Sequence, residues 1–253
     1  MATVDLNCDM GESFGPWRMG DDAAVLPHVS SASIACGFHA GDPMTMYRTV
    51  SAAIAHGVAV GAHPGLPDLA GFGRRTMAVS PEDVYAMVVY QVGALAAFAR
   101  SQGARLAHVK PHGALYNQAA LDETLAGAIA RGIARSGPDL ILVGLAGSRA
   151  MRTAAEAAGL RFAAEAFADR RYDAHGTLVS RRVPGSVIHD PQAAAEQALR
   201  IARGSVLAAD GREVPLQART LCLHGDNPNA LEIARAVRRA LDGAGIELRP
   251  LSP

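Results

Sequence analysis

Ionisable side chains recur in this sequence where short β-type runs end, and several of them follow one another at alternate positions. His108, Lys110 and His112 are spaced by two residues, so an extended backbone would point all three to the same side. Imidazole, carboxylate and ammonium groups gathered in this way suit general acid–base and electrostatic catalysis. The other members of the pattern, in chain order, are Asp5, Asn7, Asp9, Glu12, His39, His63, Glu165, Asp169, Cys222, His224 and Asp226.

Lys110 stands out because it is the single lysine among 24 basic residues, all the others being arginine. Lysine differs from arginine in carrying a compact charge and in losing its proton when desolvated. We therefore predict that this position, on the inward face of a strand, requires an ammonium group. The alternative is that Lys110 is a chance lysine that pairs with a neighbouring acid.

Two long glycine- or arginine-rich segments carry paired arginines and are placed to cover such a site. Residues 64–80 contain Arg74 and Arg75, and residues 167–189 contain Arg181 and Arg182. Paired guanidinium groups beside a cavity suit a substrate carboxylate or phosphate. The alternative for these side chains is a solvated loop surface.

The elements that position these groups alternate along the whole chain, with no linker or low-complexity segment between them. Repeated strand–helix units favour a parallel sheet joined by right-handed crossovers. Asp42, Ser80 and Asp190 each precede a proline, which is typical of a capped helix start. The predicted strands are Val4–Cys8, Ser33–Cys36, Val58–Ala62, Leu106–Val109, Leu140–Leu145, Phe162–Ala166, Leu221–Leu223 and Ile246–Leu248, and the predicted helices lie near 42–56, 81–102, 117–136, 147–158, 190–203 and 228–242.

A parallel sheet of this kind either closes into a barrel or stays open and doubly wound. An open dinucleotide-binding sheet would carry G-x-G-x-x-G after its first strand, but the turn at Asp9–Gly15 has the wrong spacing. We therefore predict an α/β fold in which residues 1–253 form a single TIM-like (β/α) barrel of seven or eight strands. Catalytic groups of such barrels gather at the C-terminal ends of the strands, so the side chains above should meet in one mouth.

The composition excludes several classes of partner. The 24 basic and 24 acidic residues give a formal net charge of zero, which provides no broad attraction to nucleic acid or to an anionic membrane. The charge-free apolar window Val84–Ala99 is too short to span a bilayer, and no secretion signal is recognised at the start. Cys8, Cys36 and Cys222 are scattered and odd in number, which favours reduced thiols and a cytoplasmic protein.

Common cofactor and hydrolase motifs are absent from the sequence. Neither G-x-x-x-x-G-K-[ST] nor H-E-x-x-H occurs, which disfavours a standard ATP-binding loop and a zincin. A divalent metal remains an option, although ligands on separate strands form no diagnostic spacing. Its candidate ligands are Asp9, His39, His63 and His224.

Seven segments together resemble the LamB/YcsF family, and they preserve the order of that family from the first strand to the last. The resemblance implies a barrel related to those of glycoside hydrolases and polysaccharide deacetylases. It also implies the role of the A subunit of ATP-dependent 5-oxoprolinase, which opens 5-oxoproline to L-glutamate with companion subunits B and C. The segments are DLNCDMGE at 5–12, ACGFHAGDP at 35–43, GAHPG at 61–65, GFGRR at 71–75, VKPHGALYN at 109–117, EAFADRRY at 165–172 and CLHGD at 222–226.

The implied reaction gives the candidate residues provisional roles. Opening a lactam requires an activated carbonyl carbon, a water nucleophile and a protonated leaving nitrogen, and ATP would supply the activation by phosphorylating the lactam oxygen. The expected catalytic residues are Asp9, Glu12, His39 and His63 for the water, Lys110 for negative charge on the oxygen or phosphate, and His112 or His224 for the nitrogen. The expected substrate-binding residues are Asn7, Arg74, Arg75, Glu165, Asp169 and Asp226, with Arg74 or Arg75 holding the substrate carboxylate.

Two other functions remain open at the level of the sequence. One is a metal-dependent hydrolase of the carbohydrate deacetylase type, and the other is a non-catalytic subunit that binds the lactam. The absence of a phosphate-binding loop also leaves open whether ATP contacts this chain or only its partner subunits.

Overall fold

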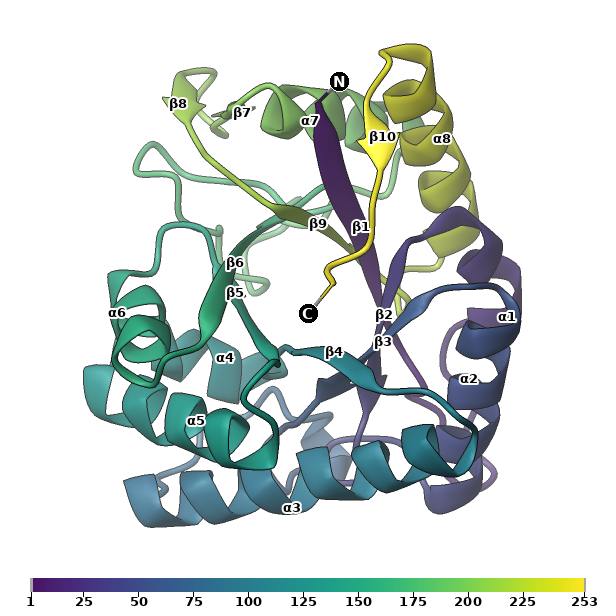
Figure 1. Cartoon of the computed structure of the whole chain (residues 1–253). Helices are drawn as coiled ribbons and strands as arrows, with labels where there is room; N and C mark the ends of the chain where they lie inside the picture. The colour runs from purple at the N-terminus through teal and green to yellow at the C-terminus, as the bar shows by residue number, and fades with distance from the viewer. Residues whose placement is uncertain (1, 253) are drawn as a thin grey trace.

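The computed structural model describes residues 2–252 and contains a closed barrel of seven parallel strands surrounded by helices (Figure 1). Each strand pairs with the next along the barrel, and β9 closes the ring by pairing with both β6 and β1. The predicted fold is therefore confirmed. The barrel strands are β1 (Thr3–Met10), β2 (Ser31–Ala35), β3 (Ala59–His63), β4 (Leu106–Val109), β5 (Ile141–Leu145), β6 (Arg161–Phe167) and β9 (Thr220–His224).

The eighth predicted strand forms, but it does not close the ring. Strand β10 (Glu247–Leu248) pairs in parallel with the first residues of β1, at Thr3 and Val4. The chain then runs across the end of the barrel where the strands begin (Figure 1). There Leu251 packs with Ile141, Val143 and Ala163, so the C-terminal segment contributes to a small apolar cluster of its own.

The helices form the outer layer and begin where the capping residues predict. The side chains of Asp42, Ser80 and Asp190 accept hydrogen bonds from the first-turn amides of α2, α3 and α7. The long helices are α2 (Pro43–Ala55), α3 (Pro81–Ser101), α5 (Glu123–Ser136), α6 (Arg149–Ala157), α7 (Pro191–Ala202) and α8 (Ala230–Gly243), and the short ones are α1 (Asp22–Val25), α4 (Gly113–Ala119), η1 (Leu26–His28) and η2 (Leu69–Gly71).

One local prediction was wrong, and one element was not predicted. The helix expected near 117–136 is divided into α4 and α5, because Asp122 caps a new helix through the amides of Thr124 and Leu125. The segment after α7 forms an antiparallel hairpin of β7 (Ser205–Leu207) and β8 (Glu213–Pro215), which was not expected. These strands are three residues long, too short to show a clear alternation.

Helix α3 is the one helix among the described residues that is long and apolar enough to cross a membrane by those two criteria. It packs against α5 and against β3 as part of the outer layer, and it buries Val88, Val92 and Leu95. A packed helix of a barrel satisfies the same criteria, so this single segment is weak support for a membrane span.

A buried carboxyl group stabilises the barrel interior near the N-terminal ends of the strands. Asp5 accepts hydrogen bonds from Ser30 and Ser31 at 2.7 Å each and from Thr220 at 2.5 Å. Burial raises the pKa of Asp5, and these three hydroxyls oppose that shift. Asp5 thereby ties β1 to β9 and to the start of β2, and the polar residues that follow it on β1 face the opposite, C-terminal end of the barrel.

Candidate active site

A cavity of about 460 Å³ opens at the C-terminal ends of the barrel strands. Six of the polar strand-end residues expected from the sequence meet in its wall, together with arginines of the two long loops. Its charged and histidine lining consists of Asp9, His63, Arg74, Lys110, His112, Glu165, Arg170, Arg181, Arg182 and His224. The volume is typical of a small-molecule site.

Lys110 lies at the centre of the barrel mouth, and its side chain is 3% exposed. Its Nζ is 2.5 Å from Asp9 Oδ1, 2.8 Å from Asn7 Oδ1 and 3.1 Å from Glu165 Oε1, with Cys222 Sγ at 3.2 Å. An ammonium group has three hydrogens, so these neighbours already engage all of them. Lys110 therefore joins β4 to β1, β6 and β9 rather than offering a free donor to the cavity.

The charge of this centre is fixed by its neighbours. Burial alone would lower the pKa of Lys110, but Asp9, Cys222 and Glu165 raise it well above its ordinary value. Burial would raise the pKa of Asp9, but His63 and Lys110 hold it well below its usual range. The expected ammonium is thus present, whereas the loss of its proton, which desolvation alone would favour, is opposed by the surrounding acids.

Glu165 connects Lys110 to a residue that the sequence analysis did not select. Its Oε1 accepts from Asn7 Nδ2 at 3.1 Å, and its Oε2 accepts from the hydroxyl of Tyr116 at 2.8 Å. Tyr116 lies in α4 and lines the cavity with Asn117. Because Tyr116 follows His112 by four residues, one helical turn, the start of α4 was the signal that could have identified it.

The ring nitrogens of His63 and His112 form a hydrogen-bonded pair with defined protons. His63 Nδ1 lies 2.6 Å from the carbonyl oxygen of Lys110, and His112 Nε2 lies 2.8 Å from that of Phe72. Carbonyl oxygens only accept, so both of these nitrogens carry hydrogen. Burial, together with His39 and His63, holds the pKa of His112 well below its ordinary value, so His112 is neutral.

The remaining nitrogen of neutral His112 must therefore accept a hydrogen bond. His112 Nδ1 lies 2.9 Å from His63 Nε2, which donates to it. His63 thus carries hydrogen on both ring nitrogens, and Asp9 Oδ2, at 3.3 Å from its Nε2, supplies the counter-charge. Both nitrogens of His112 are engaged, so in this arrangement it has no proton to transfer to a ligand.

The loop after β3 holds this pair in place. Gly73, at φ +62°, passes so close that an added Cβ would lie 2.7 Å from His39 Cβ and 2.8 Å from His112 Cδ2. His108, by contrast, lies deeper in the barrel, where its Nε2 is 3.1 Å from Ser33 Oγ, and it does not line the cavity. The alternation of His108, Lys110 and His112 therefore holds for the strand, but only the last two reach the mouth.

Glu12 and His39 lie beside the histidine pair, and their buried polar atoms lack hydrogen bonds in the described part of the chain. Glu12 Oε1 and both ring nitrogens of His39 are buried, and no hydrogen bond to them forms among residues 2–252. His39 Nε2 and Glu12 Oε1 are 3.6 Å apart. Burial raises the pKa of Glu12 well above its ordinary value, helped by Asp9, and lowers that of His39.

These residues are the ones that could hold a divalent cation. Glu12, His39, His63 and His112 each bring one ligand atom within 4.8 Å of the others. The rings of His39 and His112 are stacked, with centroids 3.7 Å apart and planes inclined by 3°. A nitrogen lone pair lies in the plane of its ring, so the two stacked rings cannot share one cation, and of the two only His39 has nitrogens free of hydrogen bonds to the described residues. A cation would therefore be held by Glu12 and His39, and His63 could join them only by losing the Nε2 hydrogen that it donates to His112. Asp9, Cys222 and His224 form a second group, but Lys110 already occupies two of its members.

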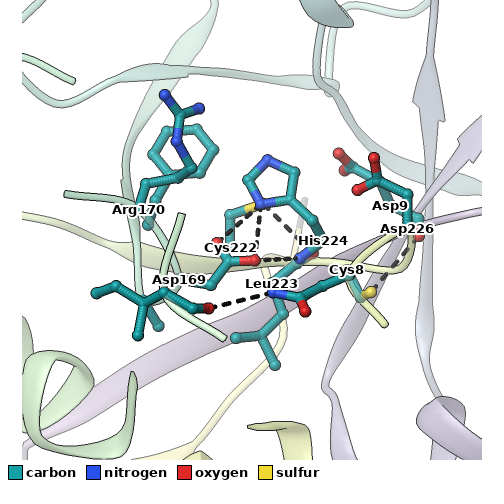
Figure 2. A network of polar contacts seen from close by, with 12 residues as sticks. Cys8, Asp9, Asp169, Arg170, Cys222, Leu223, His224 and Asp226 are labelled. Carbon is teal, nitrogen blue, oxygen red and sulfur yellow. Dashed lines mark hydrogen bonds and ion pairs between the residues drawn. The ribbon is translucent and has the colours of Figure 1, made fainter. Parts of the chain in front are cut away.

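His224 is the histidine with an oriented ring and an open nitrogen (Figure 2). Its Nδ1 lies 2.8 Å from Asp169 Oδ1, its backbone amide donates to Asp169 Oδ2 at 3.2 Å, and its ring stacks on Phe167. Burial would raise the pKa of Asp169, but His224 holds it below its ordinary value. Asp169 thus fixes the tautomer, and no residue among 2–252 hydrogen-bonds the Nε2 edge of the ring, which lines the cavity.

The two predicted loop arginines of residues 64–80 have different surroundings. Arg74 lines the cavity, stacks on Phe72 at 4.8 Å, and donates one Nη2 hydrogen bond of 2.6 Å to Asp226. Arg75 instead pairs with Asp68, remains largely exposed, and is not part of the cavity lining. Arg74 is therefore the member of this pair that a bound ligand would meet.

The fold and the site define a TIM-like (β/α) barrel whose C-terminal mouth combines an oriented histidine, a buried ammonium–carboxylate centre and several arginines. Such a mouth suits acid–base chemistry on a small anionic molecule. The sequence profile of the LamB/YcsF family matches residues 4–253, and the chain belongs to this family. The resemblance inferred from the seven segments is thereby confirmed.

Individual relatives match over nearly their whole length. The chain is 60% identical over 247 residues to the A subunit of 5-oxoprolinase from Bordetella pertussis, covering 97% of this chain and 98% of that protein. It is 56% identical over 252 residues to the A subunit of 5-oxoprolinase from Tolumonas auensis, covering 99% and 100%. The crystal structure of a lactam utilization protein from Thermus thermophilus superposes with a TM-score of 0.92 at 54% identity, covering 98% and 99%.

Proposed function

We propose that this chain is the subunit of a 5-oxoprolinase in which the lactam is opened, acting with two companion subunits (B and C) and with ATP as co-substrate. The relatives named as the A subunit of 5-oxoprolinase support the role. The observation that carries the proposal for this chain is a single cavity lined by His224, whose Nε2 has no hydrogen-bond partner among the described residues, together with Arg74 and Lys110. The cytoplasmic location expected from the cysteines belongs to the same proposal.

The chemistry sets what the site must do. The lactam oxygen displaces ADP from the terminal phosphorus of ATP, and the ring nitrogen loses its proton, which leaves an imidoyl phosphate. Water then adds to the ring carbon, and the C–N bond breaks when the nitrogen receives a proton. The resulting acyl phosphate reacts with a second water to give L-glutamate and phosphate. A site that fails to protonate nitrogen expels phosphate instead and returns the lactam, so the nitrogen's proton donor decides the outcome.

The geometry selects His224 for this proton transfer. Its Nε2 is open to the cavity while Asp169 holds its Nδ1, so the ring can take a proton from the attacking water and return it to the departing nitrogen. His112 was the other expected donor, but both of its nitrogens are engaged. In this proposal His63 and His112 shape the wall beside the reacting ring.

Lys110 acts in this proposal as a positioning residue. Its hydrogens bond Asp9, Asn7 and Glu165, so it holds these side chains in place and keeps Asp9 ionised rather than reaching the lactam oxygen itself. Arg74 binds the substrate carboxylate, because one of its five N–H donors is used by Asp226 and the others remain for the ligand.

Reconstitution tests the proposed function. The purified chain is mixed with ATP, magnesium and 5-oxoproline, with and without the two companion subunits, and L-glutamate is measured. The proposal predicts glutamate only in the complete mixture, and a mixture lacking this chain must be inactive. Glutamate formation at the full rate without this chain would exclude the role.

A second candidate function is a metal-dependent amide hydrolase of the deacetylase type. It is favoured by the potential metal-ligand atoms of Glu12 and His39, which are buried beside His63 without hydrogen bonds to the described residues. A divalent cation there would act as a Lewis acid. This alternative predicts a stoichiometric transition metal in the purified chain and ATP-independent, chelator-sensitive release of acetate from N-acetylated sugars. A non-catalytic lactam-binding subunit would bind 5-oxoproline yet tolerate combined loss of His63 and Lys110.

A further inference from the structure

Three arginines of the segment after β6 face the cavity without acidic partners. Arg170, Arg181 and Arg182 all line it, and none forms an ion pair with a carboxylate among residues 2–252. The other two permanent cations of the lining are compensated, Lys110 by Asp9 and Glu165 and Arg74 by Asp226. We call Arg170, Arg181 and Arg182 the arginine trio.

Arg170 is the buried member of the arginine trio and is held by the fold. It is 7% exposed, its Nη2 donates to the carbonyl of Val179 at 2.6 Å, and its Nε is buried without a partner. Burial and the charge of Arg181 lower its pKa to about 10. A guanidinium placed near other cations, with a buried donor unused, is a strong indication of an anionic ligand.

The backbone under Arg170 is equally well fixed. Gln197 of α7 places its Nε2 2.7 Å from the carbonyls of Phe167 and Arg170 and 3.0 Å from that of Ala168. The buried hydroxyl of Tyr172 accepts from the amide of Phe167 at 2.7 Å. These contacts preorganise Arg170 beside His224, and Figure 2 shows the guanidinium and the imidazole extending to the same side of β9.

We propose that the arginine trio binds the phosphoryl group of the activated substrate, next to the subsite in which Arg74 holds the lactam carboxylate. The inference rests on the proposed function and adds a second anion site to it. The charge of Asp169 acts on Arg170 and Arg181 without a direct ion pair, and Asp169 is already engaged by His224. 5-Oxoproline adds one negative charge, so the three positive charges of the trio still exceed the negative charge available to them. A phosphoryl group brings about two further negative charges, and its oxygens match the fork of guanidinium donors.

The trio therefore gives this chain a contact with the phosphate although its sequence has no phosphate-binding loop. Two sources share the chemistry: the phosphorylated lactam and the terminal phosphate of ATP. In both cases the phosphoryl group lies beside His224, where it is held while the proton reaches the ring nitrogen.

Calorimetric titration of the full-length chain with inorganic phosphate tests the site. We expect saturable binding that weakens roughly 10-fold or more in R181A/R182A, because two charge-assisted donors are lost. Both side chains are exposed, so the fold should survive, and circular dichroism checks this. The matched control is R212A/R249A, which removes two exposed arginines paired with Asp210 and Glu247 outside the cavity.

Titration with 5-oxoproline separates this inference from the proposed function. R181A/R182A should keep its affinity for 5-oxoproline within about threefold, since Arg74 is intact. The phosphoryl subsite is overturned if the chain does not bind phosphate, or if R181A/R182A and the control R212A/R249A bind phosphate with equal affinity. In either case, binding of 5-oxoproline would still support the proposed function. Phosphate binding without any 5-oxoproline binding refutes the function and leaves an anion site.

A third titration distinguishes the two sources. A nonhydrolysable ATP analogue with magnesium should bind the isolated chain, and lose affinity in R181A/R182A, if the nucleotide itself enters. If the phosphorylated lactam enters instead, phosphate and 5-oxoproline should bind together while the analogue does not bind. An analogue whose affinity is unchanged in R181A/R182A contradicts the nucleotide as the source.

Discussion

Replacing Lys110 is the perturbation that the structure constrains most tightly. Lys110→Met removes the cation but keeps an unbranched apolar stem, and Lys110→Arg keeps the charge but enlarges the head group. The Nζ has neighbours at 2.5 to 3.2 Å on four sides, so a guanidinium does not fit without displacing Asp9, Asn7, Glu165 or Cys222. Both substitutions should therefore impair the site, for different reasons.

The magnitude follows from what Lys110→Met leaves behind. Asp9 and Glu165 would be buried without their shared cation, and removing one partner of a buried pair costs about 3–5 kcal/mol. Lys110→Arg should cost about 1–3 kcal/mol through overpacking. We expect glutamate formation by the complete complex to fall roughly 10²–10³-fold or more for Lys110→Met, as for loss of one preorganised electrostatic contact.

Thermal unfolding and glutamate formation are measured together to separate stability from activity. The matched control is K110M/E165Q, in which a neutral amide replaces the carboxylate that the lysine no longer neutralises. It should recover part of the stability of Lys110→Met but none of its activity. Full glutamate production by both Lys110→Met and Lys110→Arg would refute the role of the lysine in the reaction. Recovery of activity in K110M/E165Q would show that Lys110 contributes only to the stability of the fold.

Three further substitutions test other parts of the site. Asp169→Asn should lower glutamate formation about 10³-fold with the fold retained, because an amide would impose the wrong tautomer on His224. Asp173→Asn in the same segment is the control. Equal activity of the two variants would contradict the role of the Asp169–His224 hydrogen bond. Burial raises the pKa of Asp22 to about 6, so its contribution to stability is complete at low pH and is lost as pH rises from about 4 to 6. The melting temperature of Asp22→Asn relative to the parent should therefore increase over that interval, and a pH-independent difference would contradict the shift. Gly73→Ala should reduce activity and stability, because its Cβ would meet His39 and His112 and its φ of +62° disfavours alanine. A melting temperature and an activity equal to those of the parent would contradict this constraint on the loop.

Much of the barrel could be predicted from the sequence, because alternating polar and apolar positions and proline-preceding caps are local signals. Asp42, Ser80 and Asp190 begin their helices as expected. The break at Asp122 was missed because a capped helix start within an alanine-rich segment interrupts no apolar periodicity. The β7–β8 hairpin was missed because its strands are too short to alternate.

The sequence predicted which residues meet in the site, but not which hydrogen bonds they form there. Strand-end spacing brought Asp9, Lys110 and His224 to one mouth, yet spacing alone gives no ring partners. Only the carbonyls of Lys110 and Phe72 show that His112 has no free proton, and only Asp169 shows that His224 is oriented. These contacts join residues far apart in the chain, so no local pattern encodes them.

The loops were the least predictable part of the site. Arg74 and Arg75 are adjacent in sequence, but one faces the cavity and the other pairs with Asp68. The backbone of Arg170 is fixed by Gln197 of α7, and no local sequence pattern links these two segments. Long loops take their conformation from the surfaces they cover, so such side chains are placed by tertiary packing.

A crystal structure of the full-length chain with 5-oxoproline bound would test the central claim most directly. We predict that the lactam lies in the cavity at the C-terminal end of the barrel, with its carboxylate on Arg74 and its ring nitrogen within hydrogen-bond distance of His224 Nε2. A lactam bound elsewhere, or bound in the cavity with its nitrogen turned away from His224, would contradict the account.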